Sequence, residues 1–281
     1  MVRATLLHSE GRRFDPCIPH TLINLSKNIL YEDKDILVID KPAGLVVHPD
    51  GRTVEPSVSE WFARTYPDSK NVGEALRLRS GQALERPGIV HRIDRETSGV
   101  LLLAKTREGH TCLKEQFQNR EIEKIYHAFV YGIIKDDQGT INLPIARSAS
   151  NFKKWSAQTR PLTPERSDGG RGGVRGIIRE AITYFQVIKR AQSKSATFIE
   201  VKPKTGRTHQ IRVHFQALHH PVVCDKLYGG RRSLGEGGCA LGFERLALHA
   251  RAITFKTVGG KKVTIEAPYP EDFQNAIKTL I

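Results

Sequence analysis

The sequence predicts a mixed α+β fold built on a largely antiparallel β-sheet with flanking helices. Segments with strand character outnumber segments with helical character along the chain. The two kinds do not alternate strictly, which disfavours a Rossmann-like arrangement. Hydrophobic residues make up 39% of the 281 residues, enough for a real core in one large domain or two modest ones.

The strands are predicted from short apolar or alternating runs that turn residues bound. The run at 100–104 follows Gly99 and has the small and β-branched residues of a buried strand. Residues 181–188 and 197–201 alternate and are expected to pair as a hairpin. The full set of predicted strands is 36–39, 45–47, 100–104, 126–130, 181–188, 197–201, 246–255 and 262–266.

Four helices are predicted from apolar residues at helical spacing, over 57–64, 107–120, 208–218 and 271–281. Ser57 and Glu60 have the spacing of a capping box at the start of the first. In the third, Ile211, Phe215 and Leu218 share one face. Between these elements we expect a long surface loop at 66–88, a mobile basic insertion at 160–176 and a Gly-rich loop at 231–239.

The charge of the chain points to a polyanionic partner. The formal net charge is +14, and nucleic acid is the first candidate for such an excess. We expect no membrane association and a cytoplasmic location, because no apolar run approaches the roughly 18–20 residues of a spanning helix and the N-terminus does not resemble a secretory signal. The four cysteines form no C-x-x-C pair, so we expect reduced cysteines and no metal site.

The segment at 88–99 is the first candidate for chemistry. It places one carboxylate, Asp94, among His91, Arg92 and Arg95, directly before the predicted strand at 100–104. A carboxylate surrounded by basic groups stays ionised, which suits a nucleophile or a base better than a proton donor. A solvated cluster of salt bridges explains the same composition, and the two readings stay open at this point.

Four motifs in a fixed order extend this observation. They are DKPAGLVVHP at 40–49, HRIDRETSG at 91–99, KIYHAFVYG at 124–132 and TGRTHQIRVH at 205–214, the last running on to DKLYG at 225–229. In this order they closely resemble the RluA-type pseudouridine synthases, enzymes that convert uridine in ribosomal or transfer RNA to its C-glycoside isomer. The resemblance covers roughly residues 30–270. It implies a pseudouridine synthase-like fold with a catalytic cleft across the sheet.

The resemblance also implies roles for individual residues. Asp94 stands at the position of the catalytic aspartate, and Tyr126 of the K-x-Y motif at that of a tyrosine that packs against the target base. The basic partner of the aspartate is carried over to Arg212, with Arg207 as the runner-up. Arg92 resembles the residue that helps to extrude the base and hold the RNA backbone. The residues expected to contact RNA are Arg92, His91, Arg95, Arg207 and Lys124.

The domain organisation departs from many family members, which carry a small RNA-binding domain ahead of the catalytic one. We expect 1–29 to form an N-terminal extension and 30–281 to form the catalytic domain, with no separate N-terminal RNA-binding domain. The expected partner is RNA, either ribosomal or transfer RNA, and the expected oligomeric state is a monomer. The isomerisation is redox-neutral, so we expect no cofactor and no metal.

Several alternatives remain open from the sequence. Asp94 could attack the sugar, attack the base or abstract a sugar proton, and all three require it to be ionised. Tyr126 is suited to stacking on a flipped base, but a cross-strand core aromatic is the ordinary reading. His209 and His214 are interpreted as structural residues. A catalytically silent RNA-binding protein and a nucleosidase that uses Asp94 are the competing functions.

Overall fold

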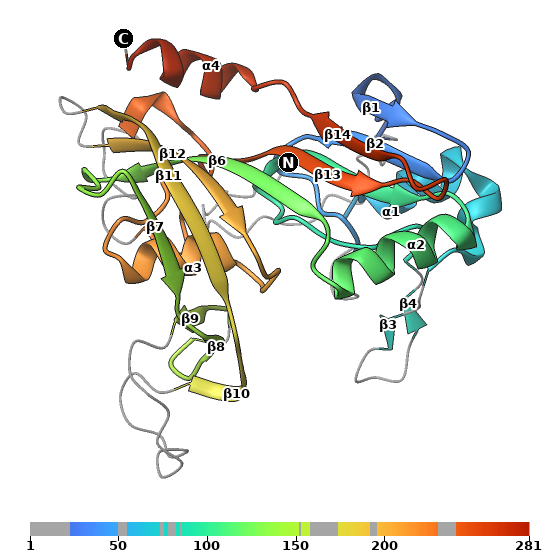
Figure 1. Ribbon diagram of the computed structural model, residues 1–281, viewed down its shortest axis with the longest axis horizontal. Coiled ribbons are helices and arrows are strands. Elements are labelled where there is room, and N and C mark those ends of the chain that lie inside the picture. Colours follow the sequence, from blue (N-terminus) through green and yellow to red (C-terminus); the bar gives the residue numbers. More distant parts are fainter. Residues whose placement is uncertain are drawn as a thin grey trace, which may run out of the picture.

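A computed structural model of the chain describes residues 23–49, 55–73, 76–77, 83–84, 86–151, 153–157, 174–191, 196–229 and 240–280 (Figure 1). Its centre is a nine-stranded sheet in the order β1-β2-β5-β13-β6-β12-β11-β7, with β14 added beside β13. These strands are β1 (Ile29–Glu32), β2 (Ile36–Lys41), β5 (Ser98–Ala104), β6 (Glu123–Tyr131), β7 (Gln138–Asn142), β11 (Ile182–Ala191), β12 (Ala196–Pro203), β13 (Leu248–Lys256) and β14 (Lys262–Glu266).

The other elements lie around this sheet. A three-stranded sheet has the order β10-β8-β9, and β3 pairs with β4. These strands are β3 (Leu76–Arg77), β4 (Ala83–Leu84), β8 (Ile145–Ser148), β9 (Trp155–Ala157) and β10 (Val174–Arg179). The helices are α1 (Val58–Thr65), α2 (Arg107–Gln118), α3 (Gln210–Ala217) and α4 (Glu271–Lys278), with short 3₁₀ turns at η1 (Ser26–Asn28), η2 (Pro67–Asn71) and η5 (Ala240–Gly242).

The predicted mixed, largely antiparallel sheet is confirmed. Every described strand pair is antiparallel except β5 with β13, which run parallel through Ser98↔His249 and Ala250↔Gly99. Gly99 has φ +106, and a Cβ there would lie 2.2 Å from the carbonyl oxygen of Ala250. Only glycine therefore allows the two strands to approach this closely.

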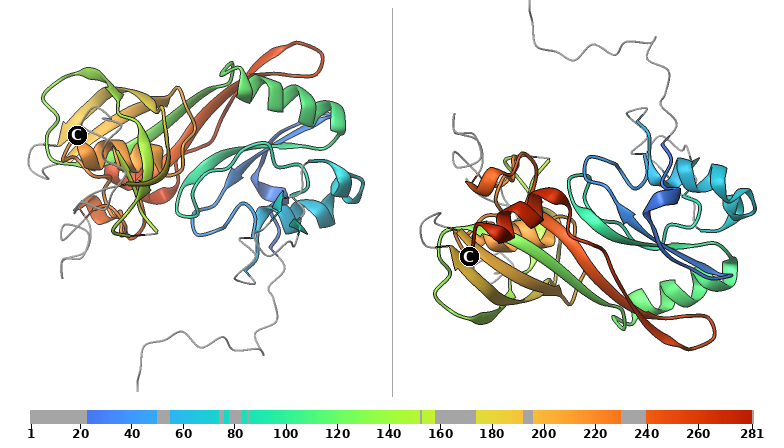
Figure 2. Two further views of the ribbon diagram at one scale, coloured as in Figure 1. Left: turned by 90° about the horizontal axis from the view of Figure 1, so that it is seen from below. Right: turned by 90° about the horizontal axis from the view of Figure 1, so that it is seen from above.

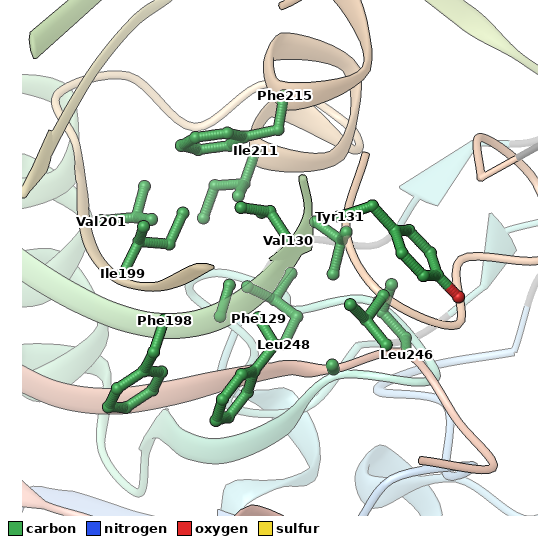
Figure 3. Close-up of a cluster of buried hydrophobic side chains, with 14 of the residues drawn as sticks. Phe129, Val130, Tyr131, Phe198, Ile199, Val201, Ile211, Phe215, Leu246 and Leu248 are labelled. Atoms are coloured by element: carbon green, nitrogen blue, oxygen red, sulfur yellow. The ribbon is translucent and has the colours of Figure 1, made fainter. Parts of the chain in front are cut away.

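The parallel pair joins two lobes. One lobe holds β1, β2, β5 and α1, the other holds β7, β11, β12 and α3, and β6 and β13 cross between them (Figures 1 and 2). The core of the second lobe is formed where aromatic and aliphatic side chains of β6 and β12 meet α3 (Figure 3). Phe129 stacks on Phe198 with ring centroids 4.6 Å apart, and Phe215 of α3 is fully buried. Such packing fixes α3 rigidly against the sheet.

Most predicted elements are present within one to three residues of their expected ends. The predicted strand 45–47 is wrong, because this segment contributes only an isolated bridge from Val46 to Ser57. The predicted hairpin is formed by β11 and β12, which pair antiparallel. The capping box of α1 is complete, because Ser57 accepts from the Glu60 amide and the Glu60 carboxylate accepts from the Ser57 amide. The strands β1, β3, β4, β7, β8 and β9 were not predicted, because they are short and lack a clear alternation of apolar residues.

Three loop predictions have different outcomes. The segment 66–88 is not loop throughout, because η2 buries Ser69 and Val72 packs in the core. The predicted insertion 160–176 lies outside the described residues up to 173, but β10 begins at Val174, so its last residues form a strand on β8. The Gly-rich loop 231–239 and residues 1–22 lie outside the described residues.

Three further findings concern membrane-spanning helices, metal sites and cysteines. Within the described residues, no helix is long and apolar enough to cross a membrane, and no group of three or more His, Cys, Asp or Glu side chains is arranged to hold a metal. The prediction of reduced cysteines is wrong for Cys224, which is disulfide-bonded. Cysteine spacing along the chain does not reveal which cysteines the fold brings together.

Candidate active site

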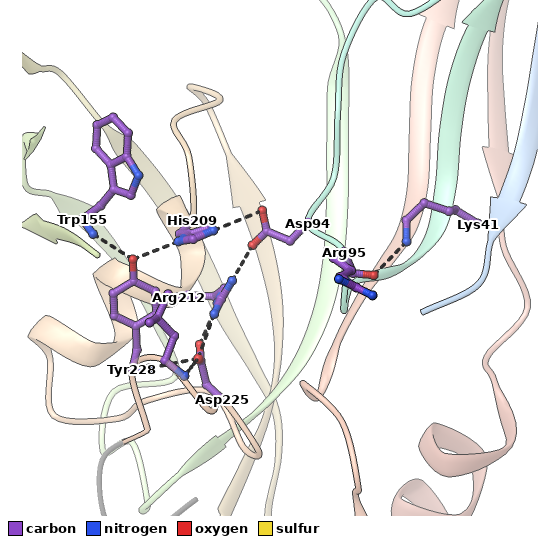
Figure 4. Close-up of polar contacts among 9 residues, drawn as sticks. Lys41, Asp94, Arg95, Trp155, His209, Arg212, Asp225 and Tyr228 are labelled. Carbon is purple, nitrogen blue, oxygen red and sulfur yellow. Dashed lines mark hydrogen bonds and ion pairs between the residues drawn. The ribbon is translucent and has the colours of Figure 1, made fainter. Parts of the chain in front are cut away.

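The loop that carries Asp94 is anchored on both sides. The Thr97 amide donates to the Asp94 carbonyl at 3.1 Å, which closes a turn, and Ile93 packs into the core of the first lobe. The Arg95 carbonyl accepts from the Gly44 amide at 2.9 Å and from Lys41 Nζ at 3.0 Å (Figure 4). The Asp94 carboxylate is therefore presented from a fixed backbone at the entrance to β5.

Lys41 is a buried anchor of this loop. Its side chain is fully buried, and Nζ also donates to the carbonyl oxygens of Pro42 at 2.7 Å and Leu45 at 2.9 Å. Burial lowers the pKa of Lys41 to about 7, against the opposing charge of Asp94. Three carbonyl acceptors match the three donors of an ammonium group, so Lys41 ties the β2 end to the Asp94 loop.

Asp94 meets Arg212, as the resemblance implied. Arg212 Nη1 donates to Asp94 Oδ2 at 2.9 Å, and the two residues come from different lobes (Figure 4). The same guanidinium donates from Nε and Nη2 to Asp225 at 2.7 and 2.9 Å. Burial opposes the charge of Arg212, but the hydrogen bonds and charges of Asp225 and Asp94 outweigh it and raise its pKa further above the ordinary value. Arg212 is thus a permanent cation beside Asp94.

Tyr228 and His209 complete this network. The Arg212 guanidinium lies over the Tyr228 ring, 5.0 Å from its centroid. The Tyr228 hydroxyl accepts from the Trp155 amide at 2.9 Å and hydrogen-bonds His209 Nδ1 at 2.9 Å. His209 Nε2 lies 4.0 Å from Asp94 Oδ1, and burial lowers the pKa of this imidazole. A neutral imidazole therefore faces the second oxygen of the carboxylate.

A cavity of about 510 Å³ opens over Asp94. Among the predicted site residues, its lining contains His91, Arg92, Asp94, Lys124, Tyr126, Arg207 and Arg212. Arg95 does not line it, because its side chain points to Glu55 at 2.8 Å and to the Gly44 carbonyl at 3.0 Å. The volume falls in the range of small-ligand pockets, roughly 300–1,000 Å³.

Tyr126 lies in β6, the strand that crosses between the lobes. It is partly buried and packs against the cores of both. Burial raises the pKa of its hydroxyl above the ordinary value, and the charge of Asp94 raises it further. Tyr126 is therefore a neutral aromatic surface that borders the same cavity as the carboxylate. Tyr126 therefore packs against both cores and also lines the cavity.

Arg92 and Arg207, two of the residues expected to contact RNA, have different surroundings. Arg92 is exposed, and its Nη1 lies 3.4 Å from His48 Nε2. Arg207 Nε donates to the Glu180 carbonyl at 2.9 Å, and its amide donates to Gln210 at 2.9 Å. Among the described residues Arg207 makes no hydrogen bond to Asp94, and Arg212 is the arginine that pairs with it.

Sequence reasoning missed part of the site. Asp225 is fully buried and accepts from Nε and Nη2 of Arg212, and the Tyr228 ring lies against the same guanidinium, yet neither received a role from the DKLYG motif. His209, interpreted as structural, lies next to Asp94, and its left-handed backbone (φ 55) starts α3. His214 is structural as expected, since it bonds Thr183 and the Leu143 carbonyl.

Comparisons with known proteins identify the family. The family model described as RNA pseudouridylate synthase matches residues 35–217. The chain is 40% identical to an uncharacterized RNA pseudouridine synthase of Aquifex aeolicus over 75% of this chain and 58% of that protein. It is 37% identical to ribosomal large subunit pseudouridine synthase D of Xanthomonas campestris over 90% of this chain and 69% of that protein.

The fold agrees with these matches. The solved structure of human RNA pseudouridylate synthase domain containing 4 superimposes with a TM-score of 0.65 and 23% identity, covering 91% of this chain and 94% of the human one. That likeness concerns the fold, while the family rests on the sequence matches. The chain spans between 58% and 72% of the curated relatives' own lengths. The chain belongs to the RluA-type RNA pseudouridine synthases, a family of isomerases.

Proposed function

We propose that this protein converts specific uridines in RNA to pseudouridine, with Asp94 as the catalytic carboxylate. The observation that carries the proposal is the Asp94–Arg212 pair, which joins the two lobes at 2.9 Å on the wall of a cavity. RNA binding alone does not require a carboxylate paired with an arginine on the wall of this cavity. This disfavours a catalytically silent RNA-binding protein.

The reaction needs a carboxylate that stays ionised and oriented. The bond between N1 of uracil and C1′ of ribose breaks, the base turns, and a bond from C5 to C1′ forms while the C5 proton is lost and N1 gains one. Arg212 holds one carboxylate oxygen, and the other faces His209 and the cavity. Attack on the sugar, attack on the base and abstraction of a sugar proton all use this free oxygen.

The target base must leave its stack to reach Asp94. Flipping a nucleotide costs a few kcal/mol, and stacking on an aromatic side chain returns about 1–3 kcal/mol. Tyr126 offers such a surface beside the carboxylate. Arg92, exposed at the rim, is suited to hold the RNA backbone while the base is out.

Ribosomal or transfer RNA is the proposed substrate, and the names of several relatives make large-subunit ribosomal RNA the first candidate. A bacterial ribosomal substrate implies a cytoplasmic location. We also propose that 30–281 acts as one catalytic domain, because the described cavity takes its lining from both lobes, and that the protein acts as a monomer.

The test compares two acid-to-amide substitutions in one loop. Asp94→Asn is expected to abolish pseudouridine formation in unmodified large-subunit ribosomal RNA and transfer RNA transcripts, while RNA affinity stays within about threefold. Glu96→Gln, an exposed acid two residues away, is the matched control and should retain activity. Turnover by Asp94→Asn would refute the role of Asp94, and release of free uracil by the wild type would indicate a nucleosidase instead.

A further inference from the structure

One end of the cavity carries positive charge without a counter-charge. Asp94 is the only acidic residue in the described lining, and Arg212 already pairs with it. The remaining cationic residues of the lining are Arg92, Arg120, Lys124, Lys204 and Arg207. Arg120 pairs with Glu180 at 2.8 Å, and Arg207 donates to the Glu180 carbonyl at 2.9 Å. Arg92 is exposed, and neither Lys124 nor Lys204 pairs with an acid among the described residues.

Lys124 is a partly buried ammonium without an acid. Its single hydrogen bond within the described residues is a long one, 3.5 Å to the Thr205 carbonyl. Burial and, to a smaller extent, the nearby charge of Lys204 together lower the pKa of Lys124 to about 8. Removing a lysine from water with so little compensation is unfavourable. Its position is explained if an anionic ligand supplies the missing acceptors.

Lys204 faces the same space from the end of β12. Its exposed ammonium makes no hydrogen bond or ion pair with any residue that the structure describes. The adjoining Gly206 leaves the approach open, since a Cβ there would lie 3.9 Å from Lys124 Nζ. Both lysines therefore line the cavity beside Gly206, Lys124 partly buried and Lys204 exposed.

His91 adds a neutral donor to this group. Its Nε2 accepts from the Leu102 amide at 2.9 Å, so the proton of the neutral ring must be on Nδ1. Burial lowers the pKa of His91 to about 3, and the charge of Lys124 contributes. The ring is held flat against Phe117, with centroids 4.8 Å apart. Within the described residues no acceptor takes the Nδ1 proton, and the ring lines the cavity.

We propose that Lys124, Lys204 and His91 form a binding site for a single RNA phosphate next to the target uridine. Two ammonium groups and one N–H donor match the charge and the several acceptor oxygens of a phosphate better than they match a neutral base. The proposal rests on the proposed function, because it assigns the phosphate to the strand whose uridine enters the cavity. It gives Lys124 and Lys204 one shared ligand.

If Lys124 and Lys204 bind the same phosphate, the effects of substituting them should not add, and this can be measured. The probe is a 5′-fluorescein-labelled, single-stranded oligouridine of 12 nucleotides, and its affinity is measured by anisotropy from 50 to 300 mM KCl. Losing one phosphate contact lowers the slope of log K against log salt by about 0.7. Lys124→Met and Lys204→Met should each show this loss with a roughly tenfold weaker affinity, and the double variant should lose no more slope than either alone. Lys34→Met, in an exposed turn, is the charge-matched control and should keep the wild-type slope.

The outcomes separate this proposal from the proposed function. Lys124→Arg, which keeps the charge, should restore the slope, and thermal unfolding checks that each variant is folded. Wild-type slopes in both single variants, or slope losses that add to about 1.4 in the double variant, would overturn the shared site. With an active RNA, both variants should raise KM and leave kcat within about threefold. A wild type that forms no pseudouridine would refute the proposed function, yet the oligouridine slopes would still decide the phosphate site.

Discussion

Arg212 binds two carboxylates in different ways, and this asymmetry predicts opposite consequences for two similar substitutions. Asp94 receives one hydrogen bond from Arg212 and its side chain is 19% exposed. Asp225 is 0% exposed and receives two, together with the amides of Leu227 at 2.9 Å and Tyr228 at 3.0 Å. Asp94→Asn should therefore remove function with little loss of stability. Asp225→Asn should remove stability first.

The expected magnitudes follow from these contacts. In Asp94→Asn, the Arg212 guanidinium keeps Asp225 as its bidentate partner, and one partly exposed ion pair becomes a hydrogen bond from the guanidinium to a neutral amide oxygen, a loss of about 1 kcal/mol. In Asp225→Asn, four donors face two oxygens, so the new NH₂ group opposes at least one of them. Removing one partner of a buried ion pair costs about 3–5 kcal/mol. Against a typical 5–15 kcal/mol of total stability, this variant should fold but unfold at much lower denaturant.

The assay is equilibrium unfolding in urea, followed by circular dichroism at a constant pH, for the wild type and both variants. The free energy of unfolding should fall by about 1 kcal/mol for Asp94→Asn and by about 3–5 kcal/mol for Asp225→Asn. Pseudouridine formation, measured under conditions where both are folded, should be absent in the first and strongly reduced in the second. Equal losses of stability in the two variants would refute the assigned asymmetry.

Three further substitutions test other parts of the structure. Gly99→Ala should cost about 3 kcal/mol of stability, because the new Cβ would meet the Ala250 carbonyl at 2.2 Å and Gly99 has positive φ; an unchanged melting temperature would contradict this. Ser57→Ala should cost about 1 kcal/mol in urea unfolding, because it removes the cap of α1. Burial lowers the pKa of fully buried His249 to about 3, so the unfolded state takes up its proton first as pH falls below 6.5. The stability advantage of wild type over His249→Gln should therefore shrink by about 2 kcal/mol from pH 7.5 to pH 5, and a constant difference would refute the assignment.

The sequence predicted those parts of the fold and site for which a residue pattern has a single structural explanation. Gly99 ahead of an apolar run predicted the buried β5, and the motif order predicted that Arg212 reaches Asp94. Arg95 was expected to contact RNA, but it does not line the cavity although it follows Asp94 directly in the chain, so its contact with RNA stays a prediction. The turn after Asp94 directs its side chain to Glu55 instead.

The missed residues have signals that a single sequence does not separate from ordinary structure. Asp225 is one of 30 acidic residues, and only the fold shows that it is buried beneath Arg212. Lys41 received no role of its own from the DKPAGLVVHP motif, although its ammonium is enclosed by carbonyl groups. Short strands such as β7 and β9 depend on tertiary pairing, because their local patterns are too weak to define them.

The narrow parallel junction between β5 and β13 has a consequence for how activity emerges during folding. Ser98 and His249 bond across it although they are 151 residues apart in the chain. Closing a loop of that length is entropically unfavourable, so contacts of this kind form late. Each lobe can bury its own side chains first, while Asp94 and Arg212 remain apart. In refolding experiments, catalytic competence should lag behind the recovery of secondary structure and report the moment at which the lobes dock.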